Sequence, residues 1–190
     1  MVKKIYILSL FFLFSTLALS AQGKHEINAF IGGFQTDFTK IREDSSQTGD
    51  LYDLYEPHFS AQSGPVLTVN YHYVFNSFLR LGAQLSYGSM EGKKTYRMGS
   101  RQQEKFNLHS LAVLPQVKLN IPGMRHFRIY GKAGIGLKLN MGTYDISPVQ
   151  FAWEVVPFGA EWGGHRVYGN AEICYGSVIR GGRIGMGFRF

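Results

Sequence analysis

The chain has 190 residues, of which 45% are hydrophobic and 15% aromatic, and it contains 23 glycines and carries a formal net charge of +7. Its single cysteine, Cys174, excludes a framework of intramolecular disulfides. The length suits a single domain once the N-terminal segment is set aside.

The N-terminal segment has the layout of a secretory signal peptide. Lys3 and Lys4 precede an apolar run that ends at Leu19, and the small residues Ser20 and Ala21 follow. An uncleaved anchor helix is the alternative, but the run is short against the ~20 residues of a membrane span. We predict a signal peptide over residues 1–21, cleaved after position 20 or 21, and one domain over residues 22–190. Because an exported chain rarely meets nucleic acid, the basic charge does not indicate such a partner.

Eight later segments alternate apolar and polar side chains with period two, which predicts β-strands. They cover residues 24–34, 65–75, 78–87, 106–121, 127–141, 149–162, 165–175 and 183–190. Polar, glycine-rich stretches predict loops at residues 35–64, 88–105, 142–148 and 177–182, and tight turns separate the remaining neighbours. We expect a bulge or kink at Pro115, and the alternation of the sixth strand becomes indistinct after Val156 and Pro157.

The last segment has the cleanest alternation. One face carries Ile184, Met186, Phe188 and Phe190, and the other carries Arg183, Gly185, Gly187 and Arg189. An apolar face that ends on an aromatic residue is typical of a strand that faces lipid. Because an open edge is too costly in lipid, this strand must pair with the first. The predicted fold is therefore all-β, a closed eight-stranded antiparallel up-and-down transmembrane β-barrel.

Aromatic residues on the outward faces gather near both ends of the predicted strands. Two such girdles mark the interfaces of a barrel that spans a bilayer. We assign to them Tyr71, Tyr73, Phe75, Tyr87, Phe127, Phe151, Trp153, Tyr175, Phe188 and Phe190. A soluble, lipocalin-like barrel is the alternative, but it would turn its apolar face inward.

The eight strands, the signal peptide, the terminal Phe190 and the paired strands at 111–120 and 127–139 resemble the small porin-like, OmpA/OmpX-type outer-membrane β-barrel family. The resemblance implies a location in the outer membrane of a Gram-negative-type bacterium, with both termini in the periplasm and four external loops. It also implies contact with outer-membrane lipid and lipopolysaccharide, and recognition of Phe190 by the barrel-assembly machinery. The family has no shared reaction and implies no cofactor.

The inward faces of the predicted strands carry charged residues. They are Glu26, Arg80, Lys118, Lys132, Lys138, Glu154, Arg166, Glu172, Arg183 and Arg189. An eight-stranded barrel is only wide enough for its own side chains to fill it, and unpaired buried charges are costly. We interpret these residues as a structural network of ion pairs, and a narrow anion-preferring path is the alternative.

The sequence offers no convincing catalytic constellation, so we do not expect an enzyme. His58 and Ser60, with Glu56 nearby, form a His-x-Ser element like that of lipid A deacylases, but they lie in a predicted loop. His109 lacks an evident acidic partner, and His72 faces the interior as a structural residue. The spacing of His, Cys, Asp and Glu resembles no metal site.

The first two external loops carry opposite charge. The first contains the acids Asp37, Glu43, Asp44, Asp50, Asp53 and Glu56 against Lys40 and Arg42; the second contains the bases Lys93, Lys94, Arg97, Arg101 and Lys105 against Glu91 and Glu104. The loops either associate or stay separately solvated, and the basic loop could bind lipopolysaccharide phosphates. We predict a monomeric, non-enzymatic envelope or surface-interaction scaffold. A narrow channel, a lipid enzyme and a subunit of a larger envelope complex are the alternatives.

Overall fold

A computed structural model describes residues 24–36, 58–95, 103–121, 127–143 and 147–190 of the chain. The predicted signal peptide, all the acids of the first predicted loop, and Arg97 and Arg101 of the second lie outside the described residues.

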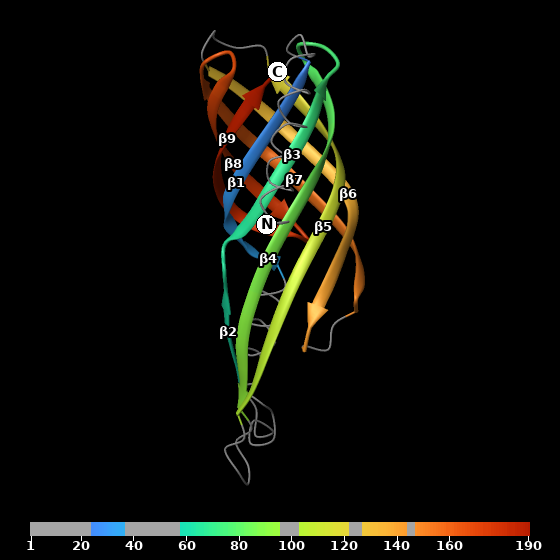
Figure 1. The fold of residues 1–190 in the computed structure, drawn as a ribbon, viewed down its shortest axis with the longest axis vertical. Helices are drawn as coiled ribbons and strands as arrows, with labels where there is room; N and C mark the ends of the chain where they lie inside the picture. The colour runs from blue at the N-terminus through green and yellow to red at the C-terminus, as the bar shows by residue number, and fades with distance from the viewer. Residues whose placement is uncertain (1–23, 37–57, 96–102, 122–126, 144–146) are drawn as a thin grey trace, which may run out of the picture.

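The described strands form one closed ring (Figure 1). They are β1 (His25–Gln35), β2 (His58–Ser63), β3 (Val66–Val74), β4 (Leu79–Thr95), β5 (Gln103–Ile121), β6 (Phe127–Gly142), β7 (Val149–Gly163), β8 (Val167–Gly176) and β9 (Ile179–Arg189). Both β2 and β3 pair with β4, so they occupy a single position in the ring. All pairings are antiparallel, and β1 pairs with β9. The predicted closed eight-stranded antiparallel β-barrel is confirmed.

The seam between the first and last strands closes the ring along almost the whole length of β1. Ile27 lies opposite Phe188, and Ile31 lies opposite Ile184. At the end of the seam, the backbones of His25 and Phe190 exchange two N–H···O hydrogen bonds of 3.0 Å. These bonds hold Phe190, the residue after β9, against the start of β1.

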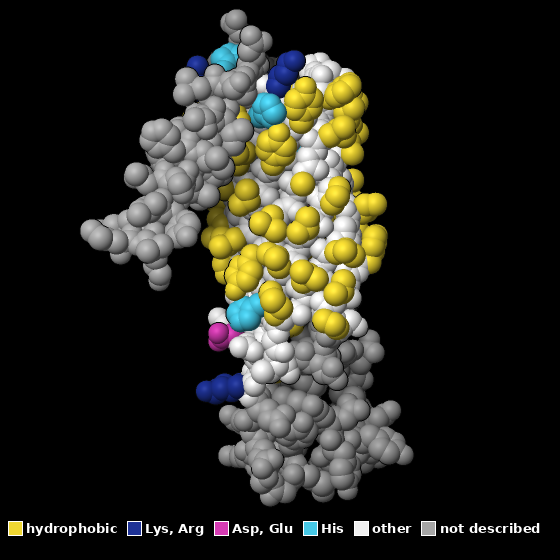
Figure 2. Space-filling model, turned by 45° about the vertical axis from the view of Figure 1, so that its right-hand side comes forward, with side chains coloured by type: hydrophobic (Ala, Val, Ile, Leu, Met, Phe, Trp, Pro, Cys, Tyr) yellow, Lys and Arg dark blue, Asp and Glu magenta, His cyan; other side chains and the backbone are white. Residues whose placement is uncertain are grey.

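Side chains alternate between the two faces of the sheet, with the polar ones inside. On β4, Arg80 and Gln84 are buried, whereas Leu81 and Leu85 are 43% and 47% exposed. Figure 2 shows the outward hydrophobic side chains covering a broad band around the barrel wall. The arrangement is the inverse of a soluble barrel, in which the apolar face fills the interior.

Two strands, β4 and β5, extend further than the sequence predicts, and a third strand beside them was not predicted. β4 continues to Thr95 and β5 begins at Gln103, so this hairpin extends well beyond the rest of the ring at the end opposite the C-terminus (Figure 1). β2 occupies residues that we predicted as loop and adds a third strand to this extension. The period-two alternation continues there, with Met90 buried and Glu91 exposed, but the outward residues become charged and were mistaken for loop residues.

The connection between the last two strands is shorter than predicted. These strands end at Gly176 and begin at Ile179, so only Ser177 and Val178 connect them. The predicted loop over residues 177–182 is wrong, and with it the strict alternation of long and short connections. Gly181 adopts a φ of 115°, a value that glycine tolerates and other residues rarely adopt.

The two prolines within strands behave differently. At Pro115 the β5–β6 pairing omits two residue pairs and resumes in the same register, so the predicted bulge is absent there. At Pro157 the β7–β8 register shifts between Val155 and Phe158. Because a one-residue shift moves every later side chain to the other face, Glu161 points inward. This bulge explains why the sequence pattern fades in the sixth predicted strand.

Glycines leave space for large neighbours inside the ring. A Cβ atom on Gly159 would lie 2.4 Å from the ring of Tyr130, and one on Gly187 would lie 2.3 Å from the ring of Tyr168. Both tyrosines are almost fully buried. Pairs of small and large residues therefore pack the interior, as a barrel of eight strands requires.

We predict that Gly136→Ala destabilises the barrel by about 1–3 kcal/mol, because its Cβ would lie 2.0 Å from the backbone oxygen of Val113. Gly131→Ala on the same strand is the matched control, since its nearest neighbour atom would lie 3.7 Å away. Urea unfolding in detergent micelles measures both. Equal stability of the two variants would contradict the close approach of β5 and β6.

Candidate functional site

The first candidate site is an ion-pair cluster in the middle of the barrel, centred on Glu172 of β8. Its carboxylate accepts hydrogen bonds from the Tyr130 hydroxyl at 2.6 Å, from Lys132 Nζ at 3.0 Å and from Arg183 Nε at 2.6 Å. Arg183 also binds Glu154 at 2.8 Å through Nη2. Four strands supply these groups, so the cluster ties β6, β7, β8 and β9 together. We call these five residues, with Gln84, the central cluster.

Gln84 extends the central cluster to the opposite wall. Its amide Nε2 on β4 donates to Glu154 at 2.8 Å, and its Oε1 accepts from Arg183 at 3.3 Å. Arg183 is fully surrounded by these acceptors and by the ring of Phe30, whose centroid lies 4.9 Å from the guanidinium carbon. The guanidinium therefore reaches across the interior from β9 to Gln84 on β4.

A second cluster lies nearer the C-terminus, around Glu26 and Glu161. Glu26 binds Arg80 at 2.5 Å and Arg189 at 2.5 Å. Glu161 forms ion pairs with Lys118 and Arg189, and lies 3.6 Å from Arg80. We call these five residues the terminal cluster. It joins β1, β4, β5, β7 and β9 across the whole ring.

The two clusters are linked through Tyr130. Its hydroxyl belongs to the central cluster, while Lys118 Nζ of the terminal cluster lies 4.0 Å from the centroid of its ring. Breaking a buried ion pair by removing one partner costs about 3–5 kcal/mol, because the other charge is left without compensation. The two clusters thus form a continuous network, in which the removal of one charged side chain leaves its partner buried without compensation.

The structure places most of the predicted inward charges in this network, but three residues differ from the prediction. Arg166 precedes β8 and is exposed, so it does not point inward as predicted. Glu161, which the sequence analysis missed, is buried and holds the terminal cluster together. Lys138 is buried away from both clusters, nearer the extended end, where its Nζ lies 3.4 Å from the backbone oxygen of Ser177.

The predicted girdle residues lie on the outer surface and form local groups at both ends of the barrel. Near the C-terminus, the His25 ring stacks on Phe190 with a centroid separation of 5.7 Å, and its Nδ1 lies 2.7 Å from the Tyr71 hydroxyl. Near the other end, Trp153 contacts Tyr175 at 5.7 Å. Phe34, Phe78, Phe158 and Trp162 are further exposed aromatics that the sequence analysis did not assign to the girdles.

The apolar band ends sharply toward the extension. On β4, Tyr87 is the last exposed aromatic, and its hydroxyl lies 3.0 Å from Nδ1 of His109 on β5. Beyond this pair the outward residues are Glu91 and Lys93 on β4, and Asn107 and Lys105 on β5. His109 thus marks the border between the apolar wall and a polar, charged extension.

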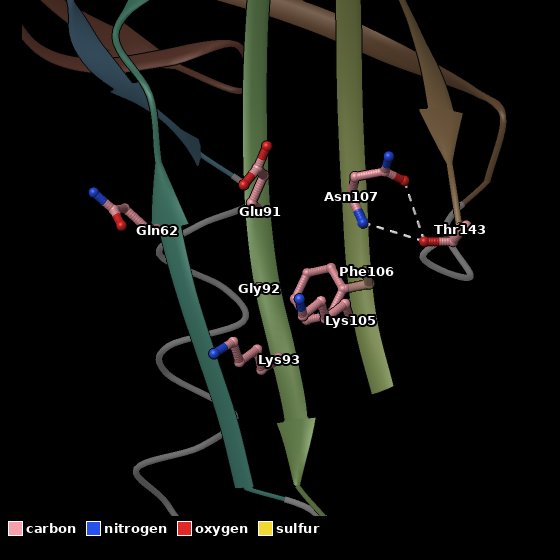
Figure 3. A pocket seen from close by; sticks show the side chains of 8 residues that line it. All are labelled: Gln62, Glu91, Gly92, Lys93, Lys105, Phe106, Asn107 and Thr143. Atoms are coloured by element: carbon pink, nitrogen blue, oxygen red, sulfur yellow. Dashed lines mark hydrogen bonds between the residues drawn. The ribbon is translucent and has the colours of Figure 1, made fainter. Parts of the chain in front are cut away.

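The extension carries the second candidate site, an open hollow beside β2, β4 and β5 (Figure 3). It is lined by Gln62, Glu91, Gly92, Lys93, Lys105, Phe106, Asn107 and Thr143. Lys93, Lys94 and Lys105 lie on paired strands, so the prediction of a basic loop is wrong for these three residues. Thr143 is fixed beside Asn107, whose backbone N–H donates to the threonine hydroxyl at 3.1 Å.

The histidines that the sequence analysis considered lie on three different strands, β2, β3 and β5. His72 is buried, and its Nε2 lies 2.9 Å from the Gln116 amide nitrogen, a contact with a structural role. His58 and Ser60 lie on β2, and Glu56 lies outside the described residues. In the described part of the chain, no group of three or more His, Cys, Asp or Glu side chains could hold a metal ion.

No family model and no curated protein matches the chain. The functional argument therefore depends on the fold and on the geometry of the two sites. Among the residues that the structure describes, none forms a helix long and apolar enough to cross a membrane.

We predict that Arg183→Met lowers the free energy of unfolding by about 3–5 kcal/mol, because Glu154 and Glu172 lose their shared partner in a buried site. Arg166→Met removes the same charge from an exposed position and should change stability by less than about 0.5 kcal/mol. Denaturant unfolding of both purified variants measures the difference. An Arg183→Met protein as stable as the wild type would contradict the network.

Proposed function

We propose that this protein is exported and resides in the outer membrane of a Gram-negative-type bacterium as an integral β-barrel. Its barrel is a non-enzymatic scaffold that presents the β2–β4–β5 extension and the neighbouring connections outside the cell. Residues 1–21 act as the cleaved signal peptide, and both ends of the mature chain lie on the periplasmic side.

One observation carries this proposal: the outer wall of the closed ring is apolar, and the inside is charged. Ile135, Ile184 and Met186 are each more than 60% exposed, while Arg183 and Glu172 are buried at the same level of the barrel. Exposed apolar area of this extent is costly in water and favourable in hydrocarbon. The closed seam leaves no strand edge unpaired in the wall, as a bilayer demands.

The charged boundary beyond Tyr87 and His109 supports the proposed orientation. Polar and charged outward side chains start there and continue as far as Lys93 and Lys105, so this part of the extension suits water or the sugar layer above a membrane. The opposite end has short connections, as the periplasmic side of such barrels does. Outer-membrane lipid and lipopolysaccharide are the proposed surroundings, and the barrel-assembly machinery is the proposed partner of Phe190.

The filled interior supports a scaffold rather than a pore. Among the described residues, the basic side chains in the interior, which include Arg80, Lys118, Lys132, Lys138, Arg183 and Arg189, outnumber the buried carboxylates of Glu26, Glu154, Glu161 and Glu172, and this favours anions over cations in any conducting state. A narrow anion-preferring channel is therefore the second candidate function. We place it second because the two clusters span the ring.

We predict that Ile135→Arg, at the middle of β6, destabilises the protein in lipid vesicles by about 2–4 kcal/mol, because it places a charge near the bilayer midplane. Met141→Arg, near the end of the same strand, should cost only about 0–1 kcal/mol. Equilibrium unfolding from vesicles measures both. In a soluble barrel an arginine at either exposed position would be tolerated, so two neutral substitutions would overturn the membrane proposal.

The location itself is tested by fractionating the envelope of cells that express the chain at natural levels. We expect the protein in the outer-membrane fraction, with a mature N-terminus at residue 21 or 22. Recovery in the cytoplasm or the inner membrane would contradict the proposal. Co-purification in mild detergent would reveal whether the barrel belongs to a larger envelope complex.

We predict that the purified protein in planar bilayers gives no steady single-channel current, because Arg183 and its partners are buried and join strands across an interior only wide enough for side chains. A reproducible, anion-selective open state would instead establish the channel and displace the scaffold role. Arg183→Ala serves as the control, since removing the guanidinium should increase any leak through the centre.

A further inference from the structure

Two lysines of the extension lie directly opposite each other. Lys93 on β4 pairs in register with Lys105 on β5, and both side chains are exposed on the outward face of the hairpin. Side chains at such positions have Cβ atoms about 4.5–5.5 Å apart, and like charges placed there destabilise a sheet. Among the described residues, neither lysine has an ion-pair partner. The extension thus keeps an unfavourable pair where a neutral residue would serve the fold better.

The surroundings of this lysine pair supply groups that suit a sugar. The same hollow is lined by the Gln62 and Asn107 amides and the Thr143 hydroxyl (Figure 3). Asn107 is held in place by Thr143, whose hydroxyl donates to Asn107 Oδ1 at 3.2 Å, so the amide nitrogen can still donate to a ligand. Glu91 adds one negative charge in the next outward row, opposite Asn107. The hollow therefore has a net charge of +1 and several polar groups around it.

The rigidity of the strands makes this a built surface rather than a mobile loop. β4 and β5 pair without interruption from Gly88 to Thr95. On the inward side, Phe106 covers Gly92, where a Cβ atom would lie 2.2 Å from the phenylalanine ring. The backbones of the two lysines are thereby held on one face of a continuous pair of strands, which lowers the entropy cost of binding.

We propose that this hollow binds a phosphorylated sugar, with Lys93 and Lys105 holding the phosphate and Gln62, Asn107 and Thr143 contacting the sugar hydroxyls. This inference deepens the proposed surface role and rests on the extension facing outward. Six residues separate Lys93 from Tyr87, or roughly 20 Å along the strand, so the hollow lies above the apolar band. The ligand is either part of a lipid-anchored glycan in the same membrane or a soluble sugar phosphate.

The soluble source is tested by calorimetric titration of the full mature chain in detergent with glucosamine 1-phosphate, and with glucosamine as the uncharged comparison. We expect binding of the phosphorylated sugar only, and about tenfold or greater weakening in Lys93→Gln/Lys105→Gln. Lys24→Gln/Arg166→Gln removes two exposed charges at the other end and should leave binding unchanged.

The lipid-anchored source is tested in phosphatidylethanolamine vesicles that contain lipopolysaccharide, either native or dephosphorylated. Acylation of lysines followed by mass spectrometry should show Lys93 and Lys105 protected by native lipopolysaccharide only. Protection without calorimetric binding assigns the lipid-anchored source, and the reverse assigns the soluble one. The proposal is overturned if neither experiment gives a signal that depends on the two lysines. The calorimetric experiment tests sugar binding independently of the membrane location, because it needs only the folded chain in detergent.

A charge reversal separates a ligand site from a purely structural role. Lys105→Glu converts the like-charge pair into an opposite-charge pair, which should increase the hydrogen-exchange protection of the extension and abolish binding. If the lysines served the structure alone, exchange protection would change while binding stayed equal to that of the wild type, and this result would overturn the proposal.

Discussion

The rest of the structure depends on the hydrogen bonds that join β1 to β9. Once the two chain ends pair, no strand edge remains open in the barrel wall, and each side chain must lie either inside or outside the ring. Period-two alternation then decides the chemistry of both surfaces at once. The seam is continued just past β9, where Phe190 exchanges two backbone hydrogen bonds with His25.

The interior follows from the same closure. Eight strands leave room for side chains only, so the polar face had to be filled by groups that satisfy one another. The central cluster around Glu172 and Arg183 and the terminal cluster around Glu26 and Glu161 meet this requirement, with Tyr130 between them. Such a network fixes the register of distant strands, since a slip of one residue would turn its charges toward the apolar side.

The strands of the barrel differ in how far they extend and in the connections that join them. β8 and β9 join through two residues, whereas β4 and β5 continue past the apolar band and gain β2 as a neighbour. Beyond Tyr87 and His109 the outward face carries charged and polar side chains instead of apolar ones. The like charges of Lys93 and Lys105 lie opposite each other in this polar part of the sheet. This position makes them the basis of the proposed phosphate site.

The sequence by itself determined the eight positions of the closed antiparallel ring and most of the faces, because alternation is a local property of each segment, but it did not reveal β2. It missed the extension of β4 and β5, since charged outward residues beyond the apolar band resemble a loop. It also missed Glu161, because the bulge at Pro157 reverses the faces and depends on pairing with β8. Which charges meet was decided only by the tertiary structure: Glu26 finds Arg189 across 163 positions because the ends of the chain close the ring.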